Sequence, residues 1–309
     1  MDFLATARLY TRVVELGSMS AAAREFEMGQ PAVSERIDRL EKYLSTKLLM
    51  RSARTLACTH EGQLFYDHSK ALLALAETAI ASVSIRGKEN LIRGPVRIAS
   101  AHCPGEILLP SILMRARMKH PELRIDLVLN DTIVDPITEG VDISLRLGHV
   151  GEGRFVAYPL GNVRRVLVAA PSFLKHAGSI SVPSDLSNHP FIRSKGTFAN
   201  EQLPLITARQ DTEFVRIQTM VTTSHWRPLY ELLIAGGGIG VLHYAACANA
   251  IRSGALVRVL PSHSIPELPF HALVQGFRPA SPRIRAVLEI LKTEIPLALQ
   301  QASAPLAEE

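Results

Sequence analysis

The sequence has few cysteines and no repeating composition. Among its 309 residues there are three cysteines, at positions 58, 103 and 247, and none belongs to a CxxC pair. Widely spaced thiols do not make a disulfide scaffold, and with the eleven histidines they give no zinc-finger spacing. The nineteen glycines and nineteen prolines follow no period, which excludes collagen-like chains. We therefore expect a compact globular protein with no metal and no cofactor.

Long uninterrupted apolar segments are also missing. The first twenty residues mix charged and apolar positions, which is not typical of a secretory signal. The least polar window, 232–250, is broken by three consecutive glycines at 236–238 and contains His243 and Asn249. We read this window as a buried helix, turn and strand, and expect a cytoplasmic protein with no membrane partner.

The signatures of common enzyme classes do not occur either. The sequence has no P-loop, HExxH, GxSxG or deaminase motif. His102 beside Cys103 allows a thiol-enzyme interpretation, but neighbours in sequence rarely have the geometry in which an imidazole activates a thiolate. A redox role for Cys103 needs a resolving thiol, while Cys58 belongs to another domain and Cys247 has the character of a buried small hydrophobe. We do not expect an enzyme, and a thiol enzyme using Cys103 is kept only as an alternative.

Positive charge is concentrated in one short stretch near the N-terminus. The whole chain has a formal net charge of +5. Residues 36–54 alone hold six Lys or Arg against two Asp or Glu, whereas residues 1–35 hold three basic and five acidic side chains. Such a stretch suits an anionic partner, although a solvated surface has the same composition. The local fold decides whether this stretch binds an anionic partner or is a solvated surface.

The pattern around this stretch predicts three helices. Apolar residues on one face of a first helix end at Gly17, which suits a left-handed C-cap. Ser18 and Ser20 are both competent N-caps for a short second helix. A third helix is expected over about 30–44, after a turn that ends at Gly29.

The third helix has two different faces. Its apolar residues recur at spacings of 4, 3 and 4, and they are Val33, Ile37, Leu40 and Leu44. The opposite face carries groups that read base edges and arginines that neutralise phosphates. Two short helices joined by a glycine-containing turn form a helix-turn-helix, whose second helix enters the major groove. The stretch 18–37 is predicted to be that unit.

A hairpin is expected after the third helix. Residues 47–50 and 56–58 read as strands on either side of a turn at 51–54, so the turn forms a wing that can reach a phosphate or a minor groove. We expect Gln30, Ser34 and Glu35 to read bases and the arginines mainly to hold phosphates. The predicted DNA-binding residues are Gln30, Pro31, Ser34, Glu35, Arg36, Arg39, Arg51 and Arg54.

Four short motifs occur in order within residues 20–62. They are Ser20-Ala21-Ala22-Ala23, Gln30-Pro31-Ala32-Val33-Ser34, Arg39-Leu40-Glu41 and Thr59-His60-Glu61-Gly62. With this order and this length, the whole chain resembles the LysR-type transcriptional regulators. Two positions depart from the family. Gly29 stands where Ser or Thr is usual and is a weaker N-cap, and Asp38 stands where a basic residue is common.

A long helix is expected next. From 63 to 86 there is no Pro or Gly, and apolar residues recur at helical spacings. In the family this linker helix packs against that of a second subunit. The resemblance therefore implies a dimer, and further a dimer of dimers. The dimerisation residues it indicates are Phe65, Leu72, Ala76, Ala79 and Val83.

The remaining chain reads as an α/β region. Strands are expected at 96–100 and 125–129 around a helix over 105–119, in a mostly parallel sheet. Further strands are expected at 143–147, 164–169, 214–220 and 239–242. The resemblance implies a two-lobed effector domain of periplasmic-binding-protein type, with crossings near 160–164 and 260–266.

We predict a winged helix-turn-helix domain at 1–59, a linker helix and hinge at 60–92, and an effector domain at 93–309. Lobe I of the effector domain is expected at about 93–162 and 266–299, and lobe II at about 163–265.

Ligands of open α/β sheets bind beyond the carboxyl ends of the strands, where helix N-termini favour anions. The end of the first strand of this region therefore indicates Ser100, His102 and Cys103 as effector-binding residues. The resemblance implies that the ends of later strands also line the effector site, and these carry Thr132, Gly148, Arg193, Thr222, Thr223 and His243. A turn or capping role is equally open for each Thr, and a core role is open for His243.

These observations predict a sequence-specific transcriptional regulator. Its expected partners are double-stranded DNA with an interrupted inverted repeat, a small effector that fits an anionic class, and further copies of itself. RNA polymerase is a further candidate partner. The alternative from another class is a ligand-sensing module whose head contacts only proteins.

Overall fold

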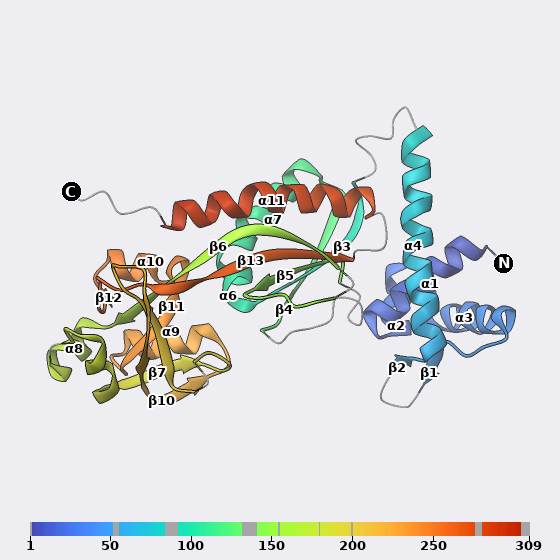
Figure 1. The fold of residues 1–309 in the computed structure, drawn as a ribbon. Helices are drawn as coiled ribbons and strands as arrows, with labels where there is room; N and C mark the ends of the chain where they lie inside the picture. Colours follow the sequence, from blue (N-terminus) through green and yellow to red (C-terminus); the bar gives the residue numbers. More distant parts are fainter. Residues whose placement is uncertain are drawn as a thin grey trace.

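The structure is a computed structural model. It describes residues 2–51, 56–83, 92–131, 141–153, 155–178, 180–198, 200–275 and 280–303. Figure 1 shows a helical head at the N-terminal end, a long helix that rises from it, and two α/β lobes placed side by side.

The head consists of three helices and a hairpin. They are α1 (Phe3–Leu16), α2 (Met19–Glu25), α3 (Gln30–Leu44), β1 (Leu49–Arg51) and β2 (Leu56–Cys58). Gly17 ends α1 in the left-handed conformation, with φ of 59°. Of the two predicted serine caps for α2, Ser18 is the one used, because its side chain accepts from the Ala21 amide at 3.2 Å. The three predicted helices are confirmed.

The hairpin begins later than the sequence indicated. A strand was expected from residue 47, but β1 starts at Leu49. The amides of Leu48 and Leu49 both donate to Glu41 Oε1, at 2.9 and 3.1 Å. The chain is therefore tied to α3 just before it pairs antiparallel with β2.

The linker helix α4 (His60–Val83) begins earlier than expected. Thr59 Oγ1 accepts from the Gly62 amide at 2.9 Å and so supplies the N-cap. A Cβ at position 62 would lie 1.9 Å from the carbonyl oxygen of Leu48, so only glycine allows α4 to cross the hairpin this closely. Tyr66 from the first turns of α4 is buried in the head core beside Tyr10 and Leu9.

The effector domain is organised around one sheet. Among the described residues its strands are β3 (Gly94–Ser100), β4 (Leu123–Leu129), β5 (Ile143–Leu147), β6 (Phe155–Ala169), β7 (Pro190–Ser194), β10 (Gln218–Thr223), β11 (Ile239–His243), β12 (Val257–Arg258) and β13 (Ile265–Gln275). Their order is β10-β7-β11-β6-β13-β5-β3-β4, with β12 on β6. The long strands β6 and β13 pair antiparallel and run through both lobes (Figure 1).

The helices of this domain cover the sheet. They are α6 (His102–Ile107), α7 (Leu109–Lys119), α8 (Pro171–Ala177), the 3-10 helix η1 (Pro183–Asn188), α9 (Trp226–Ile234), α10 (Tyr244–Arg252) and α11 (Pro282–Ser303). Helix α11 lies along β6 and packs on the lobe I core through Val287, Leu291 and Ile295. No helix in the described part of the chain is long and apolar enough to cross a membrane.

Three details of the predicted α/β region are wrong. The helix expected over 105–119 starts at His102 and is divided at Leu108, next to Pro110, which lacks the amide needed to continue a helix. The strand expected over 214–220 is two strands, because the residues up to Arg216 pair with β8 (Gln202–Ile206), whereas the strand that begins at Gln218 pairs with β7. The first of them, β9 (Thr212–Arg216), forms a separate hairpin with β8. The main sheet is mixed and not mostly parallel, since β6 and β13 pair antiparallel with all their described neighbours.

Candidate DNA-binding face and effector site

Helix α3 separates an apolar stripe from a polar face. Val33, Ile37 and Leu40 have no exposed surface. The predicted DNA-contacting residues lie on the other side of the helix. Gln30, Pro31, Glu35, Arg36 and Arg39 are exposed, and Ser34 is partly exposed.

Two of these residues contact each other. Arg39 Nη2 lies 2.5 Å from Glu35 Oε1, one helical turn away. Their side chains are 67% and 63% exposed, and an ion pair this exposed contributes little to stability. Both groups are therefore available for other partners at small cost.

A buried carboxylate fixes the end of α3 to the hairpin. Glu41 is 3% exposed and accepts from Lys47 Nζ at 2.6 Å as well as from the two hairpin amides. Burial by itself opposes ionisation, but these hydrogen bonds hold the pKa of Glu41 below its usual value. The N-terminus of α3 has no comparable side-chain hydrogen bond, because its N-cap is Gly29, which has no side-chain acceptor.

The predicted wing is only partly visible. Strands β1 and β2 pair through Leu49 with Cys58 and Arg51 with Leu56. Arg51 ends β1, and its side chain lies outside the described residues, as does the whole of Arg54 at the predicted tip.

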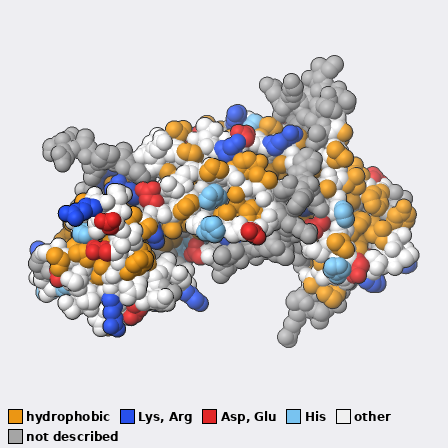
Figure 2. All heavy atoms as spheres, viewed as in Figure 1, with side chains coloured by type: hydrophobic (Ala, Val, Ile, Leu, Met, Phe, Trp, Pro, Cys, Tyr) orange, Lys and Arg blue, Asp and Glu red, His pale blue; other side chains and the backbone are white. Residues whose placement is uncertain are grey.

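The apolar surface of α4 differs in part from the predicted one. Leu72 and Ala79 are exposed and Ala76 is partly exposed, whereas the side chain of Val83 is not described. Phe65 instead packs into its own head, with its ring 5.3 Å from that of Tyr10. Three further apolar residues of α4 are exposed and were not predicted from the sequence, and they are Leu64, Leu75 and Ile80. Figure 2 shows hydrophobic side chains gathered over this part of the molecule.

The two lobes are joined by a carboxylate from lobe I. Glu106 of α6 accepts from Trp226 Nε1 at 3.0 Å and lies 2.9 Å from His225 Nε2. Arg227 Nη2 lies 4.0 Å from the same carboxylate. His225 Nδ1 accepts from the Arg227 amide at 3.1 Å, which leaves Nε2 as the donor to Glu106. Three consecutive residues at the start of α9 therefore converge on one acidic side chain.

A second histidine lies against this group. The rings of His102 and His225 are 4.4 Å apart, centroid to centroid, and they come from different lobes. His102 Nδ1 is 3.0 Å from Asp131 Oδ2, and the His102 amide donates to Asp131 Oδ1 at 2.9 Å. We name the six residues His102, Glu106, Asp131, His225, Trp226 and Arg227 the interlobe cluster.

Two predicted residues lie behind this cluster. Burial, helped by the charge of Arg165, lowers the pKa of His243 to about 4, so its imidazole is neutral at pH 7. Cys103 is 8% exposed, and burial raises the pKa of its thiol well above the usual range. A thiol held protonated in this way is a poor nucleophile, which argues against the thiol-enzyme alternative.

The other predicted effector residues are not brought together. Ser100 is buried and donates to Ala101 O, while the Gly148 amide donates to Pro269 O. Arg193 donates to Thr197 O and so holds its own loop. Thr222 is exposed, Thr223 donates to His225 O, and Thr132 lies outside the described residues. Among the residues that the structure describes, no three His, Cys, Asp or Glu side chains form a group able to hold a metal ion.

Family models match both domains of the chain. Residues 4–63 match the bacterial regulatory helix-turn-helix of the lysR family, and residues 89–296 match the LysR substrate binding domain. The chain belongs to the LysR family. It has the DNA-binding head and ligand-binding regulatory domain of these transcriptional regulators, and the LysR-type fold predicted from the sequence is confirmed.

Several relatives match over nearly the whole chain. The transcriptional activator AaeR of Escherichia coli is 28% identical over 88% of this chain and 87% of its own. The solved structure of CrgA, a LysR-type transcriptional regulator from Neisseria meningitidis, is 26% identical and has a TM-score of 0.59 over 94% of this chain and 98% of its own. The full-length Vibrio cholerae virulence activator AphB, 21% identical with a TM-score of 0.58 over 93% of this chain and 98% of its own, shares the fold.

Proposed function

We propose that this LysR-family protein reads an interrupted inverted repeat in double-stranded DNA, with one α3 from each subunit of a dimer. Gln30, Ser34 and Glu35 read base edges. Arg36 and Arg39, together with Arg51 and Arg54 of the wing, hold phosphates. The observation that carries this proposal is the division of α3 into a fully buried stripe and an exposed polar face.

The exposed apolar residues of α4 support dimerisation. Leu75 and Ile80 are 58% and 60% exposed, which is unusual for large aliphatic side chains on a long helix. Pairing α4 with the same helix of a second chain covers them and presents two heads to one side of DNA. Two recognition helices then occupy major grooves one turn apart, roughly 34 Å. We propose a dimer of dimers as the full assembly.

The interlobe cluster supports an effector site. In this arrangement Glu106 satisfies donors from His225, Trp226 and Arg227 across the two lobes. A small molecule with a carboxylate or another oxyanion satisfies the same donors, since these are the groups that bind anions. We propose a small anionic effector that competes with Glu106 and thereby changes how the lobes are held.

We further propose that the protein is not an enzyme and that it acts in the cytoplasm. The curated relatives are transcriptional regulators and not enzymes, and the buried Cys103 thiol supports no catalytic role. A regulator bound near a promoter acts in the cytoplasm, where RNA polymerase is a candidate partner.

DNase footprinting tests this proposal. The purified protein is applied to the DNA upstream of its own gene and of the divergent neighbour, with Arg36→Ala and two salt concentrations as further conditions. We expect protection of an interrupted palindrome that is lost in the variant or at high salt. Absence of specific protection there and in a genome-wide binding selection contradicts a DNA-reading head.

A further inference from the structure

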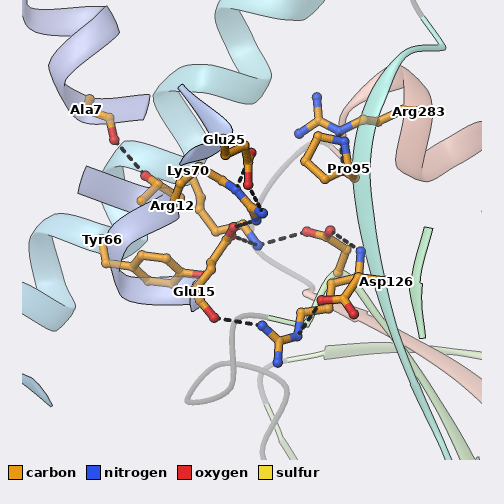
Figure 3. Close-up of polar contacts among 12 residues, drawn as sticks. Ala7, Arg12, Glu15, Glu25, Tyr66, Lys70, Pro95, Asp126 and Arg283 are labelled. Atoms are coloured by element: carbon orange, nitrogen blue, oxygen red, sulfur yellow. Dashed lines mark hydrogen bonds and ion pairs between the residues drawn. The ribbon is translucent and has the colours of Figure 1, made fainter. Parts of the chain in front are cut away.

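A cluster of charged side chains joins the DNA-binding head to lobe I of the same chain. Its members are Glu15 of α1, Tyr66 and Lys70 of α4, Arg97 of β3, and Asp142, which directly precedes β5. We name these five residues the head-body cluster. Figure 3 shows Glu15 and Lys70 pointing toward one another between the head helices and the strands of the effector domain.

Lys70 lies at the centre of this cluster. Its Nζ is 2.8 Å from Asp142 Oδ1 and 3.5 Å from Glu15 Oε1. The side chains of Lys70, Glu15 and Asp142 are only 17%, 9% and 10% exposed. Burial by itself lowers the pKa of Lys70, but the two carboxylates more than compensate and raise it above its usual value. The amine therefore stays charged and links the two domains.

Arg97 adds a second contact of a different kind. Its Nη1 donates to the main-chain oxygen of Glu15 at 2.8 Å. Glu15 lies in the last turn of α1, where carbonyl groups have no partner within the helix. A guanidinium at this end also interacts favourably with the helix dipole. A strand of the effector domain thus caps a helix of the head.

One of the two strands that carry these contacts, β3, also leads to the interlobe cluster. Asp142 Oδ2 accepts from the Arg97 amide at 2.9 Å, and β3 and β5 are parallel neighbours, with Ile98 paired to Ile143. From Arg97, β3 continues to Ser100, roughly 10 Å further at 3.3 Å per residue. His102 of the interlobe cluster begins the next helix. Strand β3 therefore contacts the head through Arg97 and ends beside the proposed effector site.

The contact between α4 and lobe I is incompletely packed beside the ion pairs of Lys70. A cavity of about 50 Å³ lies beside it, lined by Lys70, Asp142 and Ser281 among others. Ser281 Oγ is buried and has no hydrogen-bond partner in the described part of the chain. Most of the other residues that line the cavity are apolar, so it is a gap between two apolar surfaces that do not pack closely. Such an interface separates more easily than a closely packed apolar one.

We propose that the head-body cluster is a releasable lock, which holds the head on lobe I and transmits shifts of the interlobe cluster to the DNA-binding helices. This inference rests on the proposed function, because it connects its two sites. Loss of Asp142 and loss of Lys70 have different consequences for the head, because Lys70 belongs to the head and Asp142 to lobe I. Without Asp142, Lys70 keeps its partner Glu15 inside the head, so the head stays intact while the link is lost. Without Lys70, Asp142 loses its buried cation, whereas Glu15 keeps its ion pair with Arg12 inside the head.

Hydrogen exchange of the full-length protein, free of DNA and of effector, tests the lock directly. Asp142→Asn removes the charge that holds Lys70 and keeps an oxygen for the Arg97 amide. We expect exchange to become roughly tenfold faster at the C-terminal turn of α1, in the middle of α4 and at the start of β5. Exchange in α3 and in lobe II should not change. The matched control is Glu289→Gln, which removes the exposed ion pair with Lys292.

A second variant distinguishes loss of the lock from a general folding defect. Arg97→Gln removes the guanidinium that caps α1 and leaves the Lys70 pairs in place, so it should loosen the same segments more weakly. With an operator fragment, wild-type β3 should change its exchange, and β3 of Asp142→Asn should not. Unchanged exchange in both DNA-free variants overturns the lock even when the protein binds DNA. Failure of the wild type to bind DNA instead contradicts the proposed function, and the DNA-free comparison still decides on the lock.

Discussion

Trp226 Nε1 donates a hydrogen bond to Glu106 Oε2 at 3.0 Å, although the two residues lie 120 positions apart and in different lobes. Trp226 is the only tryptophan of the chain. Its indole is 6% exposed and lies under the guanidinium of Arg227, 4.1 Å from the ring centroid. The fluorescence of the intact protein therefore reports on the interlobe cluster without any label.

Glu106→Gln should loosen the junction between the lobes. Glutamine has one acceptor oxygen in place of two, so either His225 or Trp226 loses its hydrogen-bond acceptor. The charge that attracts Arg227 is lost as well. The expected cost is about 1.5 to 3 kcal/mol of the free energy of unfolding, the range for a hydrogen bond to a charged group. Trp226 emission should shift to longer wavelength, and acrylamide should quench it more strongly.

Glu231→Gln is the matched control for this variant, since it makes the same chemical change at an exposed position of the same helix α9. It should leave the emission unchanged. Equal emission spectra and equal quenching for wild type and Glu106→Gln would show that Glu106 does not hold the lobes together.

Glu41→Gln should destabilise the head in a pH-dependent way. Because its folded pKa is lowered, the Glu41 carboxylate stabilises the head above its unfolded pKa of about 4.3, and this contribution is lost as pH falls through the lower folded pKa. The variant should lose about 1 to 3 kcal/mol at pH 7. The difference between wild type and variant should shrink below pH 4, as measured by denaturant unfolding followed by circular dichroism. A difference independent of pH contradicts the role of the charge.

The local features of the head could be predicted from the sequence, and the junction between the lobes could not. The ends of α3 follow from an apolar stripe and from Gly29, which are all within fifteen residues of one another. Glu106 and Trp226 carry no local signal for their contact, because only the packing of α6 against α9 brings them together. The same holds for Lys70 and Asp142, which are 72 positions apart.

Smaller errors have local physical causes. Pro110 divided a helix that was expected to be continuous, and the strand expected over 214–220 is divided because β9 pairs with β8 and β10 pairs with β7. Phe65 fits the apolar spacing of α4, yet it lies at the end of the helix that passes through the head core. Spacing along a helix shows which residues share a face, but it does not show what covers that face.

The stability of the effector domain should fall in mildly acidic solution. In the unfolded chain the imidazole of His243 binds a proton near pH 6.5, and in the folded protein only near pH 4. The stabilising contribution of the neutral imidazole is therefore complete above about pH 6.5 and is lost as pH falls toward 4. This effect alone should cost about 2 kcal/mol at pH 5. Unfolding followed by Trp226 fluorescence at pH 7.5 and pH 5 measures it, with His243→Asn as the variant that should be less sensitive. Equal pH dependence in both proteins argues against a buried neutral imidazole.

The three thiols should react at different rates. Cys58 is partly exposed, whereas Cys103 and Cys247 are buried, and burial raises the pKa of Cys247 to about 12. A colorimetric thiol reagent should therefore modify Cys58 first and the other two only on unfolding. Cys58→Ser should abolish the early reaction. Rapid reaction at Cys103 in the folded protein would restore the thiol-based alternatives.

The most direct test of the account compares Gln30→Ala with Arg36→Ala on one operator. Dissociation constants are measured for the operator, for operators with single base-pair changes, and for unrelated DNA, over a range of salt concentrations. Gln30→Ala should cost about 1 to 3 kcal/mol on the operator and relax the preference at one position of each half-site. Arg36→Ala should weaken binding to all sequences and reduce the salt slope by about one. Equal losses on every sequence for both variants would contradict a sequence-reading face on α3.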